Sequence, residues 1–308
     1  MNLKNKIKSK LKRGSNLENV LRYIYTLLKH PQFLQKKKSF GNKNKDKTIY
    51  IIRPNTEDGI QGLMSLFVQV MRKIDYANKK GYISYVDFKN YRTQYYDGKN
   101  NCWDYFFTQP SKITIDEAYN SKNVILSGVT LKANEDVTLF KDSIFFDDKL
   151  CKYCNDLIWK NIKISDKVNK IVDNEKKKIN IEDSIGVYIR GTDYTKLQPT
   201  GEYIQPNIEE VIEKISEFEK KYPDSNIFLV TEDKKNYDKL KENFRDKLKI
   251  VSYDTFIENY NENKYLSESN CLESNLKSRG EKYLAKIVLL SQCKFLISSI
   301  TYGSIAAY

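Results

Sequence analysis

Residues 185–194 read IGVYIRGTDY, and this stretch decides how the second half of the chain folds. Its first five residues, 185–189, carry no charged side chain and are apolar apart from the Tyr188 hydroxyl, so they predict a short strand. A strand that is apolar on both sides is typical of a parallel sheet covered on both faces. An arginine, Arg190, stands directly at the end of this predicted strand.

Strands and helices alternate outward from this stretch. Segments whose apolar residues recur at helical spacing lie between the apolar runs. This alternation of strands and helices indicates a parallel α/β sheet. The predicted strands are 185–189, 226–230, 248–251 and 295–297, and the predicted helices are 207–218, 234–245 and 279–292.

The first half has a weaker form of the same rhythm. A strand at 48–52 is followed by a turn at 53–62 and by a helix whose apolar face begins at Leu63. Further strands are predicted at 82–86 and 124–126. The chain is therefore expected to form two facing Rossmann-like domains with parallel sheets, at 48–165 and 166–308.

Residues 1–47 carry most of the net charge. The whole chain has a formal charge of +13, and this segment holds fourteen Lys and Arg against two acidic residues, which leaves about +1 for the rest. Ser15 and Glu18 have capping-box spacing, and an amphipathic helix is predicted from there to Pro31. This basic segment suits an anionic membrane surface, and it equally suits plain solubility.

Composition narrows the class of protein. The chain has 308 residues, 40% of them apolar, and it contains neither an eighteen-residue apolar run nor a secretory h-region. We therefore expect a cytoplasmic globular protein, peripheral at the inner membrane face if the basic segment binds lipid. Cys151 and Cys154 form a lone C-x-x-C pair and His30 is the single histidine, so no metal site is predicted. Chemistry has to use carboxylates, arginine, hydroxyls or backbone amides.

Polar residues follow three of the predicted strands of the second half. Arg190 ends one strand, Glu232 and Asp233 follow another, and Ser298, Ser299 and Thr301 follow the last. Ligands of open α/β sheets bind beyond the carboxyl ends of the strands. A guanidinium, hydroxyls and backbone amides suit a nucleotide diphosphate, and the carboxylates suit a base or a ribose. No P-loop motif and no G-x-G-x-x-G fingerprint is present.

These residues match a known family. GVYIRGTDY at 186–194 resembles the His-Val-Arg-Arg-Thr/Gly-Asp motif of the fucosyltransferase superfamily that includes bacterial α-1,2- and α-1,6-fucosyltransferases. IFLVTED at 227–233 and LISSITYGS at 296–304 look like its second and third motifs, and DGIQGL at 58–63 is similar to its N-terminal Gly-x-Gly-Asn-Gln-Leu loop. The resemblance covers short patches from about residue 48 to the end.

The resemblance implies a GT-B-like fold and an inverting, metal-independent glycosyltransferase that moves L-fucose from GDP-fucose to a glycan acceptor. Surface-polysaccharide or glycoconjugate synthesis is the expected setting. Arg190 would contact the β-phosphate, Asp233 would lie near the guanosine, and Ser299 or Thr301 would bind phosphate. In the first domain, the loop residues would be Asp58, Gly59, Gln61 and Gly62.

Two residues depart from the family motif. Tyr188 stands where many relatives have His, and Gly191 replaces the second Arg found in some of them. The base that accepts the acceptor proton is open among Glu202, Asp193 and Asp58. Relatives continue with a helix after the third motif, so we expect the chain to be truncated beyond Tyr308.

Two alternatives remain at this point. The first is an enzyme of the same fold that uses another nucleotide-sugar donor. The other is a binding protein for nucleic acid or acidic polysaccharide that uses the basic N-terminus and the aromatic stretch 91–107. That stretch has only Arg92 and Lys99 as cations, beside Asp97 and Asp104, so no nucleic-acid partner is expected.

Overall fold

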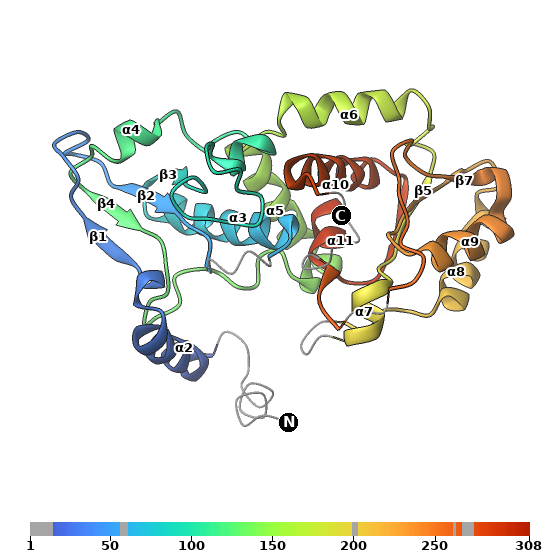
Figure 1. Ribbon diagram of the computed structural model, residues 1–308, viewed down its shortest axis with the longest axis horizontal. Coiled ribbons are helices and arrows are strands. Elements are labelled where there is room, and N and C mark those ends of the chain that lie inside the picture. The colour runs from blue at the N-terminus through green and yellow to red at the C-terminus, as the bar shows by residue number, and fades with distance from the viewer. Residues whose placement is uncertain (1–14, 56–60, 199–202, 261–262, 267–273) are drawn as a thin grey trace. The chain divides into compact units, whose positions relative to one another are not determined.

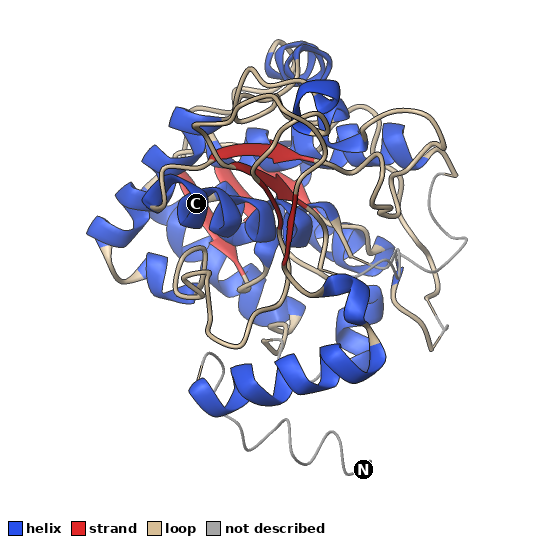
Figure 2. Ribbon diagram, turned by 90° about the vertical axis from the view of Figure 1, so that its left-hand side faces the viewer, coloured by secondary structure: helices blue, strands red, loops and turns tan. Residues whose placement is uncertain are grey.

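The computed structural model describes residues 15–55, 61–198, 203–260, 263–266 and 274–308. The chain divides into two compact units, Met1–Ile164 and Ser165–Tyr308. Each unit contains one four-stranded sheet. Figure 2 shows the strands in red with helices packed around them.

The sheet of the first unit has the order β1-β4-β2-β3. Strand β2 (Ile49–Ile52) is parallel to β3 (Ile83–Val86) and to β4 (Val124–Leu126). Strand β1 (Lys36–Lys38) pairs antiparallel with β4 and forms an edge. The sequence pattern did not predict this strand, because three exposed lysines carry no apolar signal. Lysines are typical of an edge strand that resists pairing with another chain.

Helices and loops cover both faces of this sheet (Figure 1). Helix α3 (Leu63–Lys79) packs against β2 and β3. Strands β2 and β4 also pack with Ile113, which precedes α4 (Ile115–Ala118), and with Ala118, which ends it. The rings of Trp103, Phe106 and Phe107 are buried, so these aromatics are not available to stack on a nucleobase. The described residues of this unit also form α2 (Asn16–Lys29), η1 (Pro31–Phe33), η2 (Cys102–Tyr105), η3 (Asp142–Phe145) and α5 (Asp148–Asn161).

The sheet of the second unit is parallel throughout and has the order β7-β6-β5-β8. Its strands are β5 (Ile185–Tyr188), β6 (Ile227–Val230), β7 (Leu248–Lys249) and β8 (Phe295–Ser298). Strand β5 lies between β6 and β8, with Tyr188 level with Val230 on one side and with Ser298 on the other. The three polar segments that follow β5, β6 and β8 therefore follow neighbouring strands.

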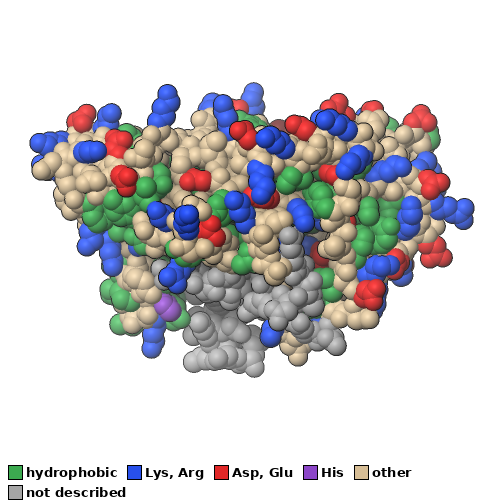
Figure 3. All heavy atoms as spheres, turned by 45° about the horizontal axis from the view of Figure 1, so that its top comes forward, with side chains coloured by type: hydrophobic (Ala, Val, Ile, Leu, Met, Phe, Trp, Pro, Cys, Tyr) green, Lys and Arg blue, Asp and Glu red, His purple; other side chains and the backbone are tan. Residues whose placement is uncertain are grey.

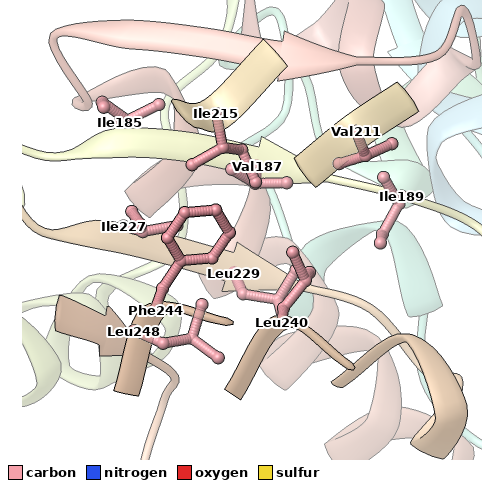
Figure 4. Close-up of a cluster of buried hydrophobic side chains, with 10 residues drawn as sticks. All are labelled: Ile185, Val187, Ile189, Val211, Ile215, Ile227, Leu229, Leu240, Phe244 and Leu248. Carbon is pink, nitrogen blue, oxygen red and sulfur yellow. The ribbon is translucent and has the colours of Figure 1, made fainter. Parts of the chain in front are cut away.

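Helices α8 (Ile208–Lys221) and α9 (Lys234–Phe244) cover one face of this sheet. Their buried side chains, such as Ile215 and Leu240, pack on Val187 and Leu229 of the central strands (Figure 4). Helix α10 (Leu276–Ser291) packs on β5 and on α6 (Asp166–Lys176). The short elements are α7 (Thr192–Leu197), η4 (Arg245–Lys247) and α11 (Tyr302–Ala307).

No helix in the described ranges is long and apolar enough to cross a membrane. Among the described residues, Cys102, Cys151, Cys154 and Cys293 are free thiols. Cys151 and Cys154 lie in α5, which is a regular helix.

Candidate functional site

Three strand ends meet at the carboxyl edge of the second sheet. Arg190 follows β5, Glu232 and Asp233 follow β6, and the 299–301 segment follows β8. Because β5 is hydrogen-bonded to both of the other strands, the three ends lie next to one another. The strand order therefore brings these groups to one edge of one sheet, as the sequence pattern predicts.

Arg190 is held by two carboxylates. Its Nη2 lies 2.9 Å from Asp193 Oδ1, and its Nε lies 3.1 Å from Glu232 Oε1. The guanidinium also stacks over the ring of Tyr194, 4.3 Å from its centroid. The side chain is 19% exposed, so it still reaches solvent. Burial lowers the pKa of Arg190, but its negative neighbours, led by Glu232, outweigh burial and raise that pKa above its ordinary value.

Glu232 fixes the turn that carries Arg190. Its Oε1 accepts hydrogen bonds from Arg190 Nε, from the Gly191 amide at 3.0 Å and from Thr192 Oγ1 at 3.0 Å. One carboxylate oxygen thus binds three successive residues. This pattern is that of a positioning group, because Glu232 orients the guanidinium and the backbone that follows it.

Asp233 joins the same turn to helix α9. Its Oδ1 accepts from the amides of Lys235 at 2.8 Å and Asn236 at 3.2 Å, so it is the N-cap of α9. Its Oδ2 accepts from the Thr192 amide at 3.2 Å. Both oxygens are engaged by backbone donors within the second unit.

Gly191 lies directly against Asp233. A Cβ at position 191 would come within 2.4 Å of Asp233 Oδ2 and 2.5 Å of Asp233 Cβ. No side chain fits there while Asp233 caps α9. This contact gives a physical reason why glycine stands where some relatives of the motif carry a second arginine.

Thr192 adopts a left-handed backbone conformation, with φ of 42°. That region is costly for a β-branched residue and is maintained only when the surroundings impose it. Here the Thr192 amide binds Asp233, and its hydroxyl binds Glu232. The turn after β5 is therefore a strained segment held in place by the two acidic residues after β6.

Asp193 is 2% exposed, and both of its oxygens are occupied. Oδ1 binds Arg190, and Oδ2 accepts from the Leu266 amide at 2.9 Å. A base that takes a proton from an acceptor hydroxyl has to reach that hydroxyl. These contacts favour a role for Asp193 in positioning Arg190 over its predicted role as the base.

The segment after β8 is tied together by hydroxyl groups. Ser299 is nearly buried, and its hydroxyl donates to Gln205 Oε1. Thr301 is the N-cap of α11 and forms a capping box with Ser304, whose amide lies 3.1 Å from Thr301 Oγ1. The Ser304 hydroxyl also donates to the Ser299 carbonyl at 2.8 Å. Ser298 is the last residue of β8 and is half-buried.

Sequence reasoning missed Gln205, because a single glutamine before a proline in a loop gives no periodic signal. It also missed the stacking of Tyr194 on Arg190. Tyr194 stands four residues after Arg190, on a six-residue helix too short to show an apolar face. Glu202, the third candidate for the base, lies outside the described residues.

Tyr188, which stands where many relatives have His, is part of the core. It is 2% exposed, and its hydroxyl lies 3.1 Å from that of Tyr283 on α10. Gly303 packs on both rings, since a Cβ there would come within 2.6 Å of Tyr283 Oη and 2.8 Å of Tyr188 Cε1. The tyrosine at this position therefore supports α11 instead of lining the strand ends.

The predicted loop of the first unit is only partly described. Asp58 and Gly59 lie outside the described residues. Gly62 is the N-cap residue of α3, and Gln61 Oε1 accepts a hydrogen bond from Gln69 at 3.2 Å. The Gln61 carbonyl accepts from Gln94 at 2.5 Å.

Two buried cations lie at the start of this loop. Lys73 on α3 is 1% exposed, and its Nζ donates to the Arg53 carbonyl and to Asn55 Oδ1, both at 2.7 Å. Arg53 is 6% exposed and donates to three backbone carbonyls, including that of Ser127 at 2.8 Å. The burial of Lys73 could not be predicted from the sequence, because the residue stands in an amphipathic helix where lysine is usually exposed.

The pKa of Lys73 is lowered to about 8, chiefly by burial, with Glu135 opposing the shift and Arg53 adding to it. The unfolded chain, with a pKa near 10.4, then binds more protons than the folded chain between pH 8 and pH 10.4. Below pH 8, a charged and buried Lys73 lowers the free energy of unfolding by the full amount. Above pH 10.4 this effect disappears, because Lys73 is then neutral in both the folded and the unfolded chain. We expect this residue to make stability rise with pH across that window, by up to about 3 kcal/mol.

The measurement is the free energy of unfolding against pH for the wild type and for Lys73→Met. The difference between the two curves should change across pH 8–10.4, and the control Lys80→Met, at an exposed position, should run parallel to the wild type. A constant difference between wild type and Lys73→Met would contradict the assignment.

No group of three or more His, Cys, Asp or Glu side chains that would suit a metal ion occurs in the part of the chain that the structure describes. The predicted absence of a metal requirement stays a prediction about the reaction.

Comparison with known proteins identifies the fold. No family model matches the sequence, and no curated protein matches it. Solved structures do match. Fucosyltransferase NodZ from Bradyrhizobium is 14% identical over 85% of this chain and 92% of its own, with a TM-score of 0.53. Crystals of NodZ α-1,6-fucosyltransferase soaked with GDP-fucose, and crystals grown with GDP, match with the same TM-score and identity over 85% of this chain and 91% of NodZ.

This chain has the fold of GT-B fucosyltransferases. The expected α/β class with two mostly parallel sheets flanked by helices is confirmed, with one antiparallel edge strand, β1, that was not expected. The structural similarity spans most of the chain, whereas the sequence resemblance rests on short motifs.

Proposed function

We propose that this chain is a glycosyltransferase that moves L-fucose from GDP-fucose to a hydroxyl group of a glycan acceptor, with inversion and without a metal ion. The observation that carries the proposal is Arg190, held at the carboxyl end of the central strand β5 between the ends of β6 and β8. The fold shared with NodZ, whose crystals were soaked with GDP-fucose, supports the choice of donor.

The reaction has one demanding step. The acceptor oxygen bonds to C1 of the sugar, the C1–O bond to the β-phosphate breaks, and GDP leaves with the bonding electrons. The acceptor proton goes to a base. Negative charge grows on the β-phosphate as that bond breaks, so a fixed cation beside it lowers the barrier.

Arg190 is suited to this task because its orientation is set in advance. A guanidinium has five N–H donors, and the ion pairs with Asp193 and Glu232 use the Nε hydrogen and one Nη2 hydrogen. The remaining donors are available, among the contacts of the described residues, for phosphate oxygens. The two carboxylates and the Tyr194 ring prevent the side chain from adopting other rotamers, which would otherwise reduce the time spent in the active geometry.

The neighbouring hydroxyls of Ser299 and Thr301 are proposed to lie along the same phosphates. The Thr301 hydroxyl accepts from the Ser304 amide, and the Ser299 hydroxyl donates to Gln205. A serine hydroxyl has one hydrogen, so Ser299 has to turn from Gln205 to donate to a phosphate oxygen. Asp233, which the family resemblance assigns to the guanosine, uses both oxygens on backbone amides. Base recognition therefore needs other groups, and this is why the donor has to be tested against other nucleotides.

The test of donor class is a thermal shift with GDP, UDP and dTDP, followed by release of GDP from GDP-fucose in the presence of EDTA. A ligand at a hundred times its Kd stabilises the folded state by about 2.7 kcal/mol. We expect GDP to raise Tm by several degrees, UDP and dTDP to have little effect, and GDP release to persist in EDTA.

A larger shift with UDP or dTDP than with GDP would replace the proposed donor while keeping the transferase. No shift with any of the three nucleotides at millimolar concentration would overturn the proposal of a nucleotide-sugar site. Loss of GDP release in EDTA, restored by a divalent ion, would contradict metal independence alone.

A further inference from the structure

Helix α2 turns its hydrophobic side away from the described residues of the first unit. Leu17, Leu21, Ile24 and Leu28 stand at i, i+4, i+7 and i+11, so they share one face of the helix. They are 60%, 40%, 45% and 73% exposed. Amphipathic helices of globular proteins usually place this face on the core.

The opposite face of α2 carries polar side chains and is the one that packs on the protein. Thr26 is the buried residue of the helix, and Asn19 and Tyr23, two turns and one turn before it, are half-buried. The helix is therefore inverted relative to an ordinary surface helix. Its apolar face is turned to solvent among the described residues, and Leu27, at 47% exposure, widens it.

Exposed cations lie on the same segment of the chain. Arg22 and Lys29 share the side of α2 between its apolar face and Thr26, and the three lysines of β1 follow the helix in the chain, all of them exposed. Figure 3 shows one face of the molecule, where blue Lys and Arg side chains are spread among green hydrophobic ones. Across residues 1–47 the sequence holds twelve more positive than negative charges.

We propose that α2 binds the surface of an anionic lipid bilayer, with its apolar face at the boundary between headgroups and acyl chains. The charge pattern favours this partner over a second copy of the chain, because pairing two such helices would bring two strongly positive segments together. A helix of fourteen residues is about 21 Å long and suits the plane of an interface, not a transmembrane path. This docking does not depend on the proposed transferase activity.

The experiment is flotation of the whole chain with vesicles of phosphatidylcholine alone or of phosphatidylcholine mixed with phosphatidylglycerol. The chain should float with the anionic vesicles, stay behind with neutral ones, and bind less tightly as salt screens the charges. Absence of binding to anionic vesicles at low salt would overturn the proposal.

The apolar face is tested with Leu21→Ser, Ile24→Ser and Leu28→Ser combined. Because the three side chains are exposed, the variant should keep the wild-type Tm, and its affinity for anionic vesicles should fall at least about tenfold. The matched control is Leu131→Ser with Phe146→Ser, which removes apolar groups that are 53% and 87% exposed elsewhere in the first unit and should leave binding unchanged.

The charges are tested with Lys36→Gln, Lys37→Gln and Lys38→Gln combined. Successive side chains of a strand point to opposite faces, so one or two of the three lysines can lie against one surface. Each lysine near an anionic surface contributes about fivefold, so we expect a loss of roughly five- to twenty-five-fold. The control removes three other exposed lysines of the first unit, Lys149, Lys152 and Lys163, and should bind nearly as well as the wild type.

Two results would show that the apolar face of α2 does not bind a bilayer. Wild-type affinity in the apolar variant would show that α2 does not enter the bilayer. A wild-type dimer in solution that becomes a monomer in the apolar variant would show that a second copy covers α2. Either result overturns the proposal.

Discussion

Replacing Arg190 with lysine is expected to lower kcat/KM for the donor that the wild type turns over by about 10²–10³-fold, while the chain stays folded. Lysine keeps the positive charge but is a compact point charge that lacks the planar fork. It cannot bind Glu232, Asp193 and a phosphate oxygen in the geometry that the guanidinium has. The measurement is steady-state release of the nucleoside diphosphate.

Arg190→Ala has a second effect that has to be separated from the first. It leaves Asp193, 3% exposed at its side chain, and Glu232, 16% exposed, without their cation. Removing one member of a buried pair costs about 3–5 kcal/mol, so this variant should lose stability as well as activity. Arg190→Lys is therefore the variant that reports on chemistry.

The matched control is Arg245→Lys, at an exposed arginine of the same unit, and it should keep wild-type kcat/KM. If a folded Arg190→Lys protein keeps kcat/KM within a few-fold of the wild type, Arg190 has no specific role at the leaving phosphate.

Gly191→Ala is expected to remove nearly all activity and to lower the free energy of unfolding by about 1–3 kcal/mol. The new methyl group would come within 2.4 Å of Asp233 Oδ2, which caps α9, so either the cap or the turn after β5 has to move. Arg190 is the residue immediately before this turn. A shift of about 1 Å in a group that acts on the reacting atoms costs about 10²-fold in rate.

A second substitution tests whether this contact is the cause. Asp233→Gly removes the atoms that the methyl group would meet. It also removes the N-cap of α9 and the acceptor of the Thr192 amide, so by itself it should lower stability by about 1–3 kcal/mol. The loss of stability caused by Gly191→Ala should be smaller in the Asp233→Gly background than in the wild type. Equal losses in the two backgrounds would mean that a different contact excludes a side chain at 191.

The strands of both sheets were largely predictable, because a short apolar run between two amphipathic helices is typical of a buried parallel strand. The expected strand 124–126 is β4 itself, and the expected strand 185–189 contains β5. Edges were harder to predict. Strand β1 consists of three lysines, and nothing local marks it as part of a sheet, because its pairing with β4 depends on residues almost ninety positions away.

The candidate site was predictable in place but not in the role of each residue. Strand order brings Arg190, Glu232 and Ser299 to one edge, as the parallel rhythm indicates. A sequence shows which carboxylates follow a strand, but not what their oxygens bind. Glu232 and Asp233 accept hydrogen bonds from the turn at 190–192, and this contact is set by the packing of β5 beside β6.

For helix α2 too, the sequence predicted the element but not its contacts. Its spacing predicts an amphipathic helix, and the structure contains one at Asn16–Lys29. Periodicity does not say which face meets the protein. The polar residues Asn19 and Thr26 face inward, and this orientation depends on contacts with residues outside the helix.

The most direct test of the central claim is a crystal structure of the chain with GDP. We predict that an oxygen of the β-phosphate lies about 2.7–2.9 Å from an Nη of Arg190, with the 299–301 segment beside the same phosphate. GDP bound with its diphosphate away from Arg190, or no GDP in crystals soaked to saturation, would contradict the account.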